Sequence, residues 1–129
     1  MAYNNFKYDV DADGIALVTW DMPGKSMNVF TEEVMVELNA ITDKVMADEA
    51  VKGVVFTSGK DSFSGGADLT MLKGMFEIYR KEKAKDPDKA VKILFEMTGK
   101  MTGLFRKIET SGKPWVSAIN GICMGGAFE

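Results

Sequence analysis

Two Gly-Gly-Ala segments, at residues 65–67 and 125–127, hold the residue types in this sequence that could do chemistry. Each follows an apolar run typical of a buried strand, and each precedes residues that could begin a helix. Glycine allows a tight turn, and the first N–H groups of a helix have no internal partner, so such a junction can bind an oxygen that carries or develops negative charge. Two such junctions side by side would form an oxyanion hole. The simpler alternative is that each glycine pair only permits a tight turn.

The chain contains no histidine, and this restricts the chemistry that its own residues can perform. A Ser/His/Asp triad, a Cys/His dyad and an HExxH zinc site are all excluded within this sequence. Acid–base chemistry near neutral pH must therefore come from carboxylates, Lys, Tyr or Cys. Cys123 lies in an apolar loop with no histidine to lower its pKa, so a small buried side chain is a better interpretation than a nucleophile. The loop "GICMGG" does not match G-x-G-x-x-G, and no P-loop is present.

Composition favours one compact globular domain. The net charge of −3 and the sequence pI near 5.1 provide no basic stripe for nucleic acid. No apolar run approaches the roughly 20 residues that span a bilayer, and the start of the chain has no secretory signal pattern. The single cysteine cannot form an internal disulfide. We therefore expect a soluble cytoplasmic protein.

The elements that must position the two junctions follow from periodicity and turn residues. Alternation predicts strands at 5–10 and 14–20, joined as a hairpin by "DADG". Helical spacing after Thr31 predicts a helix over about 31–48, followed by a buried strand at 53–58. A second helix should follow from the end of the first Gly-Gly-Ala segment, with Ala67 and Asp68 in its first turn. Residues 70–108 should be largely helical with a break at "AKDPDK", and a last strand should begin at Pro114. This order is typical of an α/β fold with crossover connections.

Two sets of apolar residues in the helical region have expected roles. One face of its second half should pack on the core or on a neighbour. Methionines at helical spacing are more often core filler than ligands, although they could also line a tunnel for an acyl chain. The first set is Val91, Leu94, Phe95, Met101, Leu104, Phe105 and Ile108, and the second is Met71, Met75, Met97 and Met101.

The segments "SFSGGADL" and "KPWVSAINGICMGGAFE" together resemble the enoyl-CoA hydratase/isomerase (crotonase) superfamily. That family has an F-x-x-G-A-D loop and a segment of the second kind at about this separation. With "DMPGKSMNVFT" and the long helical stretch, the chain is most similar to the amino-terminal hydratase domain of multifunctional fatty-acid oxidation α subunits. The resemblance implies an α/β, crotonase-like spiral of ββα units. Residues 1–129 would form its incomplete amino-terminal part, with the rest of the domain and any dehydrogenase domain outside this sequence.

The resemblance also assigns residues. The two oxyanion N–H donors fall on Ala67 and Gly126, and the first catalytic glutamate falls on Glu129, which we would otherwise interpret as an exposed carboxylate at a helix end. Asp68 needs no catalytic role, because an acid in the first turn stabilises a helix. Contacts to coenzyme A, made largely by backbone, would fall on Lys25, Met27, Asn28, Ser64, Gly65, Gly66 and Gly125.

The function implied by the resemblance is hydration of 2-trans-enoyl-CoA to 3-hydroxyacyl-CoA in fatty-acid β-oxidation. The reaction would need no metal, coenzyme A would enter as part of the substrate, and NAD would serve only a fused 3-hydroxyacyl-CoA dehydrogenase. A second glutamate of such hydratases would follow Glu129, so we expect these 129 residues alone to be nearly inactive. We also expect self-association through exposed apolar surface, and a thiolase subunit as a partner of the parent protein. An isomerase of the same superfamily and a non-catalytic acyl-CoA-binding fragment remain alternatives.

Overall fold

The chain begins with the predicted hairpin, seen in a computed structural model that describes residues 3–129. Strands β1 (Phe6–Val10) and β2 (Ile15–Trp20) pair antiparallel. Asp11 shapes the turn, because its Oδ1 accepts hydrogen bonds from the N–H groups of Asp13 at 3.0 Å and Ile15 at 2.8 Å. Gly14 has a φ of +84°, a value that favours glycine. The hairpin prediction is confirmed to within a residue.

Helix α1 (Glu32–Ala47) confirms the expected helix over 31–48. Thr31 is its N-cap, with its side chain accepting a hydrogen bond from the Val34 N–H at 3.2 Å. Glu32 and Glu33 stand in the first turn, where their carboxylates stabilise the helix by interacting with the positive end of its dipole. The residues at helical spacing, Val34, Leu38, Ile41 and Val45, are all buried.

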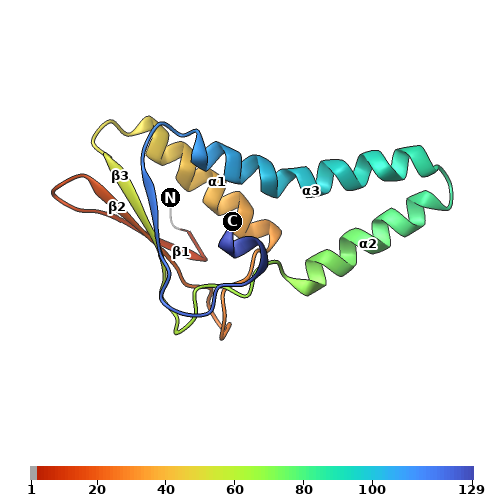
Figure 1. Ribbon diagram of the computed structural model, residues 1–129, viewed down its shortest axis with the longest axis horizontal. Coiled ribbons are helices and arrows are strands. Elements are labelled where there is room, and N and C mark those ends of the chain that lie inside the picture. Colours follow the sequence, from red (N-terminus) through yellow and green to blue (C-terminus); the bar gives the residue numbers. More distant parts are fainter. Residues whose placement is uncertain (1–2) are drawn as a thin grey trace.

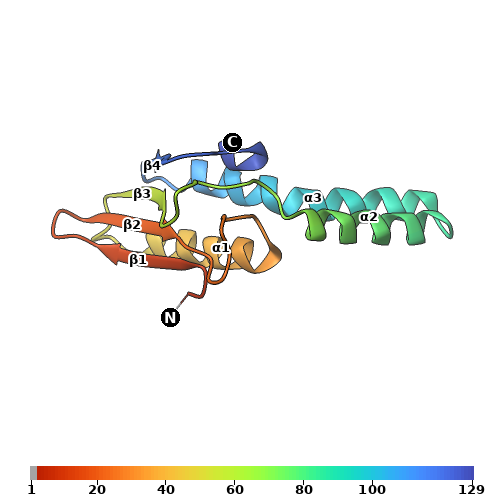
Figure 2. The same ribbon diagram turned by 90° about the horizontal axis from the view of Figure 1, so that it is seen from below.

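One sheet carries the fold, in the strand order β1-β2-β3-β4. Strand β3 (Gly53–Ser58) pairs parallel with β2, and β4 (Trp115–Ala118) pairs parallel with β3. The structure thus confirms the expected α/β order with crossover connections. Figures 1 and 2 show α1 alongside the sheet and the carboxyl-terminal segment running past β3 to end beside α3 (Pro87–Glu109), on the side of α3 away from α1. The carboxyl ends of the parallel strands therefore lie at the same edge, where both Gly-Gly-Ala segments follow.

The core lies between the sheet, α1 and the end of α3. Trp20 is fully buried at its centre and contacts the rings of Phe6, Phe30 and Phe56, with ring centroids 4.7 to 6.1 Å apart. Aromatic side chains bury large apolar areas, so this group contributes much of the hydrophobic stabilisation. It also fixes Phe30, whose backbone holds the first junction.

Helices α2 (Leu69–Lys83) and α3 (Pro87–Glu109) form an antiparallel hairpin that projects from the sheet as an arm (Figures 1 and 2). The predicted break falls between them, and Asp86 caps α3 by accepting a hydrogen bond from the Lys89 N–H at 3.0 Å. We expected Ala67 and Asp68 in the first turn of α2, which is wrong. Ala67 is still extended in a bridge with Phe30, and Asp68 is the N-cap of a helix that begins at Leu69.

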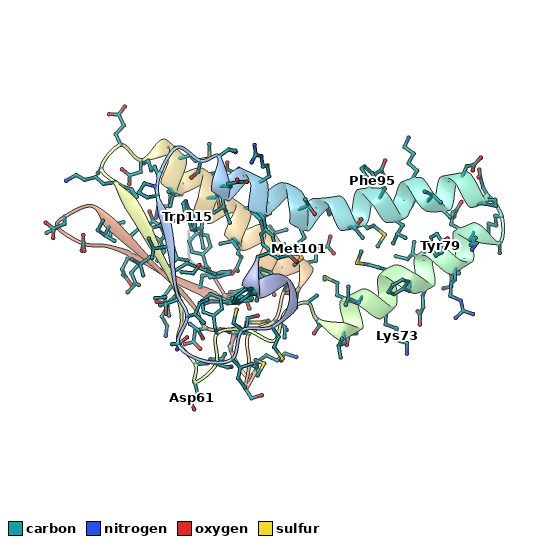
Figure 3. The ribbon with its side chains drawn as sticks, in the orientation of Figure 1. Asp61, Lys73, Tyr79, Phe95, Met101 and Trp115 are labelled. Atoms are coloured by element: carbon teal, nitrogen blue, oxygen red, sulfur yellow. The ribbon has the colours of Figure 1, made fainter. Side chains whose placement is uncertain are left out.

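The expected apolar face of α3 is confirmed only near the sheet. Leu104 is buried there, and Phe105 and Ile108 pack against the core. Val91 and Phe95 are 60% and 77% exposed, because they lie on the side of the arm that faces away from α2, beyond the reach of the sheet. Figure 3 shows Phe95 pointing outward from α3.

The second junction also differs from expectation. Gly125–Phe128 forms a single 3-10 turn, η1, where we expected the start of an α-helix. The Ala127 N–H donates to the Met124 carbonyl at 3.2 Å, which is the three-residue spacing of such a turn. Glu129 stands directly at the end of this turn.

Candidate functional site

The two Gly-Gly-Ala segments lie side by side. Ser64 and Cys123 form a parallel bridge, in which the Ser64 N–H donates to the Ile122 carbonyl and the Met124 N–H donates to the Ser64 carbonyl, both at 3.0 Å. Gly66 follows with a φ of +84°, and a Cβ there would lie 2.7 Å from the Met124 oxygen. The close approach requires glycine. The sequence suggested this adjacency, and the structure shows it.

The N–H groups of Ala67 and Gly126 are both free. Neither donates to an acceptor in residues 3–129, whereas the Ala127 N–H is bonded within the second turn. In the first turn the reason is geometric. Phe30 pairs with the flanking groups, since its N–H donates to the Gly66 carbonyl at 2.8 Å and its carbonyl accepts from the Asp68 N–H at 2.9 Å, so the Ala67 N–H faces the opposite side.

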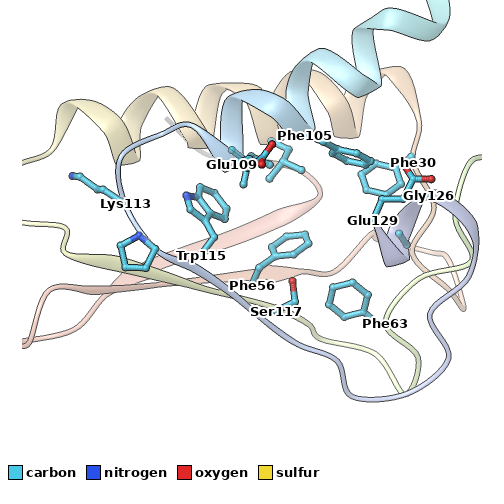
Figure 4. Close-up of a pocket in the computed structure, with 14 residues that line it drawn as sticks. Phe30, Phe56, Phe63, Phe105, Glu109, Lys113, Trp115, Ser117, Gly126 and Glu129 are labelled. Carbon is cyan, nitrogen blue, oxygen red and sulfur yellow. The ribbon is translucent and has the colours of Figure 1, made fainter.

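Glu129 is exposed and lies at the boundary between two cavities. It shares the larger, of about 420 Å³, with Gly126, and the smaller, of about 190 Å³, with Ala67. Figure 4 shows Glu129 and Gly126 together at one end of the larger cavity. Glu129 therefore borders both cavities, whereas Gly126 lines only the larger and Ala67 only the smaller.

The larger cavity lies between the sheet and the end of α3, and its lining is mainly apolar and includes several aromatic side chains (Figure 4). Phe105 and Phe30 stand next to each other in it, with ring centroids 5.6 Å apart. Glu109 lines it from α3, about midway along in Figure 4, and Lys113 lies at the end opposite Glu129. The larger cavity is therefore a largely apolar space with the Glu129 carboxylate at one end.

The smaller cavity lies between the bases of α2 and α3 and is lined by thioether side chains. Met101 reaches the second junction, where a Cβ on Gly126 would lie 2.6 Å from the Met101 Cε. Thioethers are flexible and apolar, which suits a surface that accommodates different chains. The methionines that line the cavity are Met35, Met71, Met75, Met97 and Met101.

The loop expected to contact coenzyme A lies beside the first junction. Lys25 is exposed, and Met27 is half-buried with its sulfur 2.8 Å from where a Cβ on Gly65 would be. The Gly65 N–H donates to the Asn28 carbonyl at 2.9 Å, which ties the loop to the junction. The exposed Lys25 and the half-buried Met27 are open to a ligand, as is the exposed Gly125 in the other turn.

Asn28 is fully buried, and its side chain joins three segments of the chain, around Trp20, Ser58 and Phe63. Its Oδ1 accepts from the Met22 N–H at 3.0 Å, and its Nδ2 donates to the Trp20 carbonyl at 2.8 Å and to the Ser58 Oγ at 2.9 Å. Its side chain therefore supports the loop from within, and any ligand contact must come from backbone. The sequence offered no signal for the role of Ser58, because a buried serine that bonds an asparagine 30 positions away leaves no periodic pattern.

The model of the enoyl-CoA hydratase/isomerase family matches residues 11–129. The chain belongs to this family. It is 38% identical over 125 residues to the fatty acid oxidation complex subunit alpha of Idiomarina loihiensis, covering 96% of this chain and 16% of that protein. The subunit of the same name from Shewanella amazonensis is 39% identical over 118 residues, covering 91% and 15%.

Solved structures of the hydratase/isomerase family share the fold. An enoyl-CoA hydratase from Shewanella pealeana superposes with a TM-score of 0.77 at 18% identity, covering 97% of this chain and 42% of that one. An enoyl-CoA hydratase/isomerase from Xanthobacter autotrophicus superposes with a TM-score of 0.74 at 25% identity, covering 98% of this chain and 42% of that one. The expected crotonase-like fold is thus confirmed, and the chain spans less than half of these structures.

Several residues of this hydratase/isomerase family member can be set apart from the site. Asp68 caps α2 through its bond to the Met71 N–H at 2.9 Å, which accounts for its conformation. Cys123 is half-buried, and burial raises the pKa of its thiol, so the nucleophilic thiolate is disfavoured.

Residues 3–129 contain no cluster of three or more potential metal ligands from His, Cys, Asp and Glu. No helix in that range is long and apolar enough to cross a membrane.

Proposed function

We propose that this chain carries the oxyanion site and the first catalytic acid of an enoyl-CoA hydratase that acts in fatty-acid β-oxidation. The observation that supports this most is the pair of free N–H groups, on Ala67 and Gly126, in two turns held together by a backbone bridge. Family membership supports the substrate class, a thioester of coenzyme A. The relatives' name supports a role in a complex for fatty acid oxidation. A fused dehydrogenase part and a thiolase partner are further proposals.

The proposed mechanism begins at the thioester oxygen. The N–H groups of Ala67 and Gly126 donate to this oxygen and stabilise the negative charge that it gains as the enolate forms. Water adds at the β carbon, and its proton passes to the Glu129 carboxylate as general base. A proton then passes to the α carbon from the Glu129 carboxyl, directly or by way of the second glutamate proposed downstream, which completes the hydration and returns Glu129 to the carboxylate. Losing one oxyanion donor costs about 2.7–4 kcal/mol in other enzymes, so two donors supply a large part of the rate enhancement.

The acyl chain is proposed to enter the methionine-lined cavity. Ala67 and Glu129 both line this cavity, so a thioester held at Ala67 would direct its tail between α2 and α3. Lys25 is exposed, and we propose that its ammonium contacts a phosphate of coenzyme A. The family's second glutamate would lie downstream of Glu129, so we expect low activity from residues 1–129 alone. The parent protein is the proper enzyme to assay.

The direct test is hydration of crotonyl-CoA, followed by loss of the enoyl absorbance, by the native polypeptide that carries this sequence. Glu129→Gln should lower kcat at least about a hundredfold, because a general base typically contributes that much. Glu109→Gln is the matched control, since Glu109 is also exposed and lines the same larger cavity. Equal rates for both variants would contradict the role of Glu129. Supplying 3-enoyl-CoA in parallel separates isomerase from hydratase activity.

A further inference from the structure

Ser64 stands where three segments of the site meet, and it is fully buried. Its hydroxyl donates to the Asn28 carbonyl at 3.0 Å and accepts a hydrogen bond from the Gly66 N–H at 3.1 Å. Its own backbone forms the bridge to Cys123 that joins the two turns. One side chain thus links the Asn28 loop and the first glycine turn, while its backbone holds the second turn.

The geometry of the Ala67 N–H depends on Gly66. The Gly66 carbonyl and the Ala67 N–H belong to one peptide unit. The Phe30 N–H holds that unit by donating a hydrogen bond to the Gly66 carbonyl at 2.8 Å. Gly66 has no side chain and a φ of +84°. The peptide unit between Gly65 and Gly66 could therefore rotate if its N–H had no hydrogen-bond partner. That peptide is held by the Ser64 hydroxyl, which bonds the Gly66 N–H. Both sides of Gly66 are therefore fixed.

We propose that Ser64 is a positioning residue that holds Gly66 so that the N–H groups of Ala67 and Gly126 converge on one oxygen. This inference rests on the proposed function. The Ser64 hydroxyl is buried and has both of its bonds within the protein, so it acts through Gly66 and makes no contact with substrate. A misplacement of about 1 Å in a reacting geometry can cost up to a hundredfold in rate. The hydroxyl therefore contributes to catalysis from a buried position.

The test compares Ser64→Ala with Ser62→Ala in the native polypeptide. Ser62 is the matched control, because it is also buried in this loop and its hydroxyl makes no hydrogen bond to residues 3–129. The probe is a cinnamoyl-CoA thioester with a para amino donor, whose absorption shifts to the red when its carbonyl is polarised. We expect Ser64→Ala to lose most of that shift and to lower kcat with crotonyl-CoA by about 10- to 100-fold, with KM changed less than about threefold. Ser62→Ala should match the wild type.

The shift separates positioning from general structural damage. Retention of the wild-type shift and kcat in Ser64→Ala would overturn the inference, as would a wild-type protein that binds the probe without any shift. A wild type that shows the shift yet hydrates nothing would instead overturn the proposed function, and loss of the shift in Ser64→Ala would still support the positioning role. If Ser64→Ala fails to fold, Ser64→Cys retains the volume with weaker hydrogen bonds and should give an intermediate shift. An unchanged shift in Ser64→Cys would count against the role.

Discussion

Gly66 packs directly against the main-chain carbonyl of Met124, with the position of a Cβ at residue 66 only 2.7 Å from the Met124 oxygen. The two residues belong to different Gly-Gly-Ala turns, so their contact sets the spacing of the two turns. Any side chain at position 66 would push the turns apart and would also meet an unfavourable φ of +84°. The oxyanion site therefore depends on the absence of a side chain at this position.

Gly66→Ala should lower both stability and activity. The strained φ and the contact with Met124 predict a loss of about 1–3 kcal/mol in the free energy of unfolding, together with a large fall in kcat. Gly74→Ala on α2 should have the opposite effect on stability, a gain of about 0.5–1 kcal/mol, because that helical glycine has open space around its Cβ position. Urea unfolding of both variants checks the prediction. Equal changes in the free energy of unfolding for Gly66→Ala and Gly74→Ala would show that a side chain fits between position 66 and the Met124 carbonyl.

Asn28→Ala should destabilise the protein by at least about 2 kcal/mol, measured by thermal or urea unfolding. The variant leaves the Met22 N–H buried without its partner, and an unpaired buried group costs about 1–3 kcal/mol. It also removes the bonds to Trp20 and Ser58. Asn39→Ala is the control, since Asn39 is exposed on α1 and its loss should change stability by less than about 0.5 kcal/mol. A similarly small change in stability for Asn28→Ala would show that the hydrogen bonds of the Asn28 side chain do not stabilise the fold.

Asp21 should make stability depend on pH. Hydrogen bonds from Lys7 and Lys60 hold the pKa of its carboxyl below the usual value of 3.8. Because the folded pKa is the lower one, the unfolded chain binds a proton first as pH falls, so the stabilisation is present above pH 3.8 and is lost as pH falls through the folded pKa. Asp21→Asn should therefore lower stability at pH 7, and its difference from wild type should shrink below about pH 4. A difference that stays constant down to pH 2 would contradict this ion pair.

Met97→Phe should alter chain-length preference if the methionine-lined cavity holds the acyl tail. The ring narrows the cavity, so we expect kcat/KM for a long-chain enoyl-CoA to fall at least about tenfold, with the value for crotonyl-CoA nearly unchanged. Met46→Phe on the exposed side of α1 is the control, and it should leave both values unchanged. A parallel fall for both substrates in Met97→Phe would place the tail elsewhere.

Periodic and capping signals explain how much of the fold was predictable. Val34, Leu38 and Ile41 repeat at helical spacing behind an N-cap, which located α1 to within a residue at each end. The strand at 53–58 matched its prediction as well, since it is a short apolar run between glycines. These elements follow from local sequence alone. The adjacency of the two junctions was only a possibility in the sequence, because it depends on the strand order of the sheet.

Side-chain roles that depend on distant partners could not be predicted. Asn28 and Ser64 were expected to contact a ligand largely through backbone, which stays a prediction. The sequence could not show that both residues are fully buried and bond backbone more than 30 positions away or within their own turn. Phe95 was expected on a packed face, but the projecting arm leaves it exposed. The division of the sequence into domains, and the roles of Ala67, Gly126 and Glu129, stay predictions.

The central claim is that one substrate oxygen binds to both free N–H groups, and a crystal structure of the native polypeptide with acetoacetyl-CoA tests it most directly. The account predicts the thioester oxygen at about 2.7–3.1 Å from both the Ala67 and the Gly126 nitrogen. It also predicts the reacting carbons facing Glu129. A thioester oxygen that contacts neither nitrogen, or only one of them, would contradict the account.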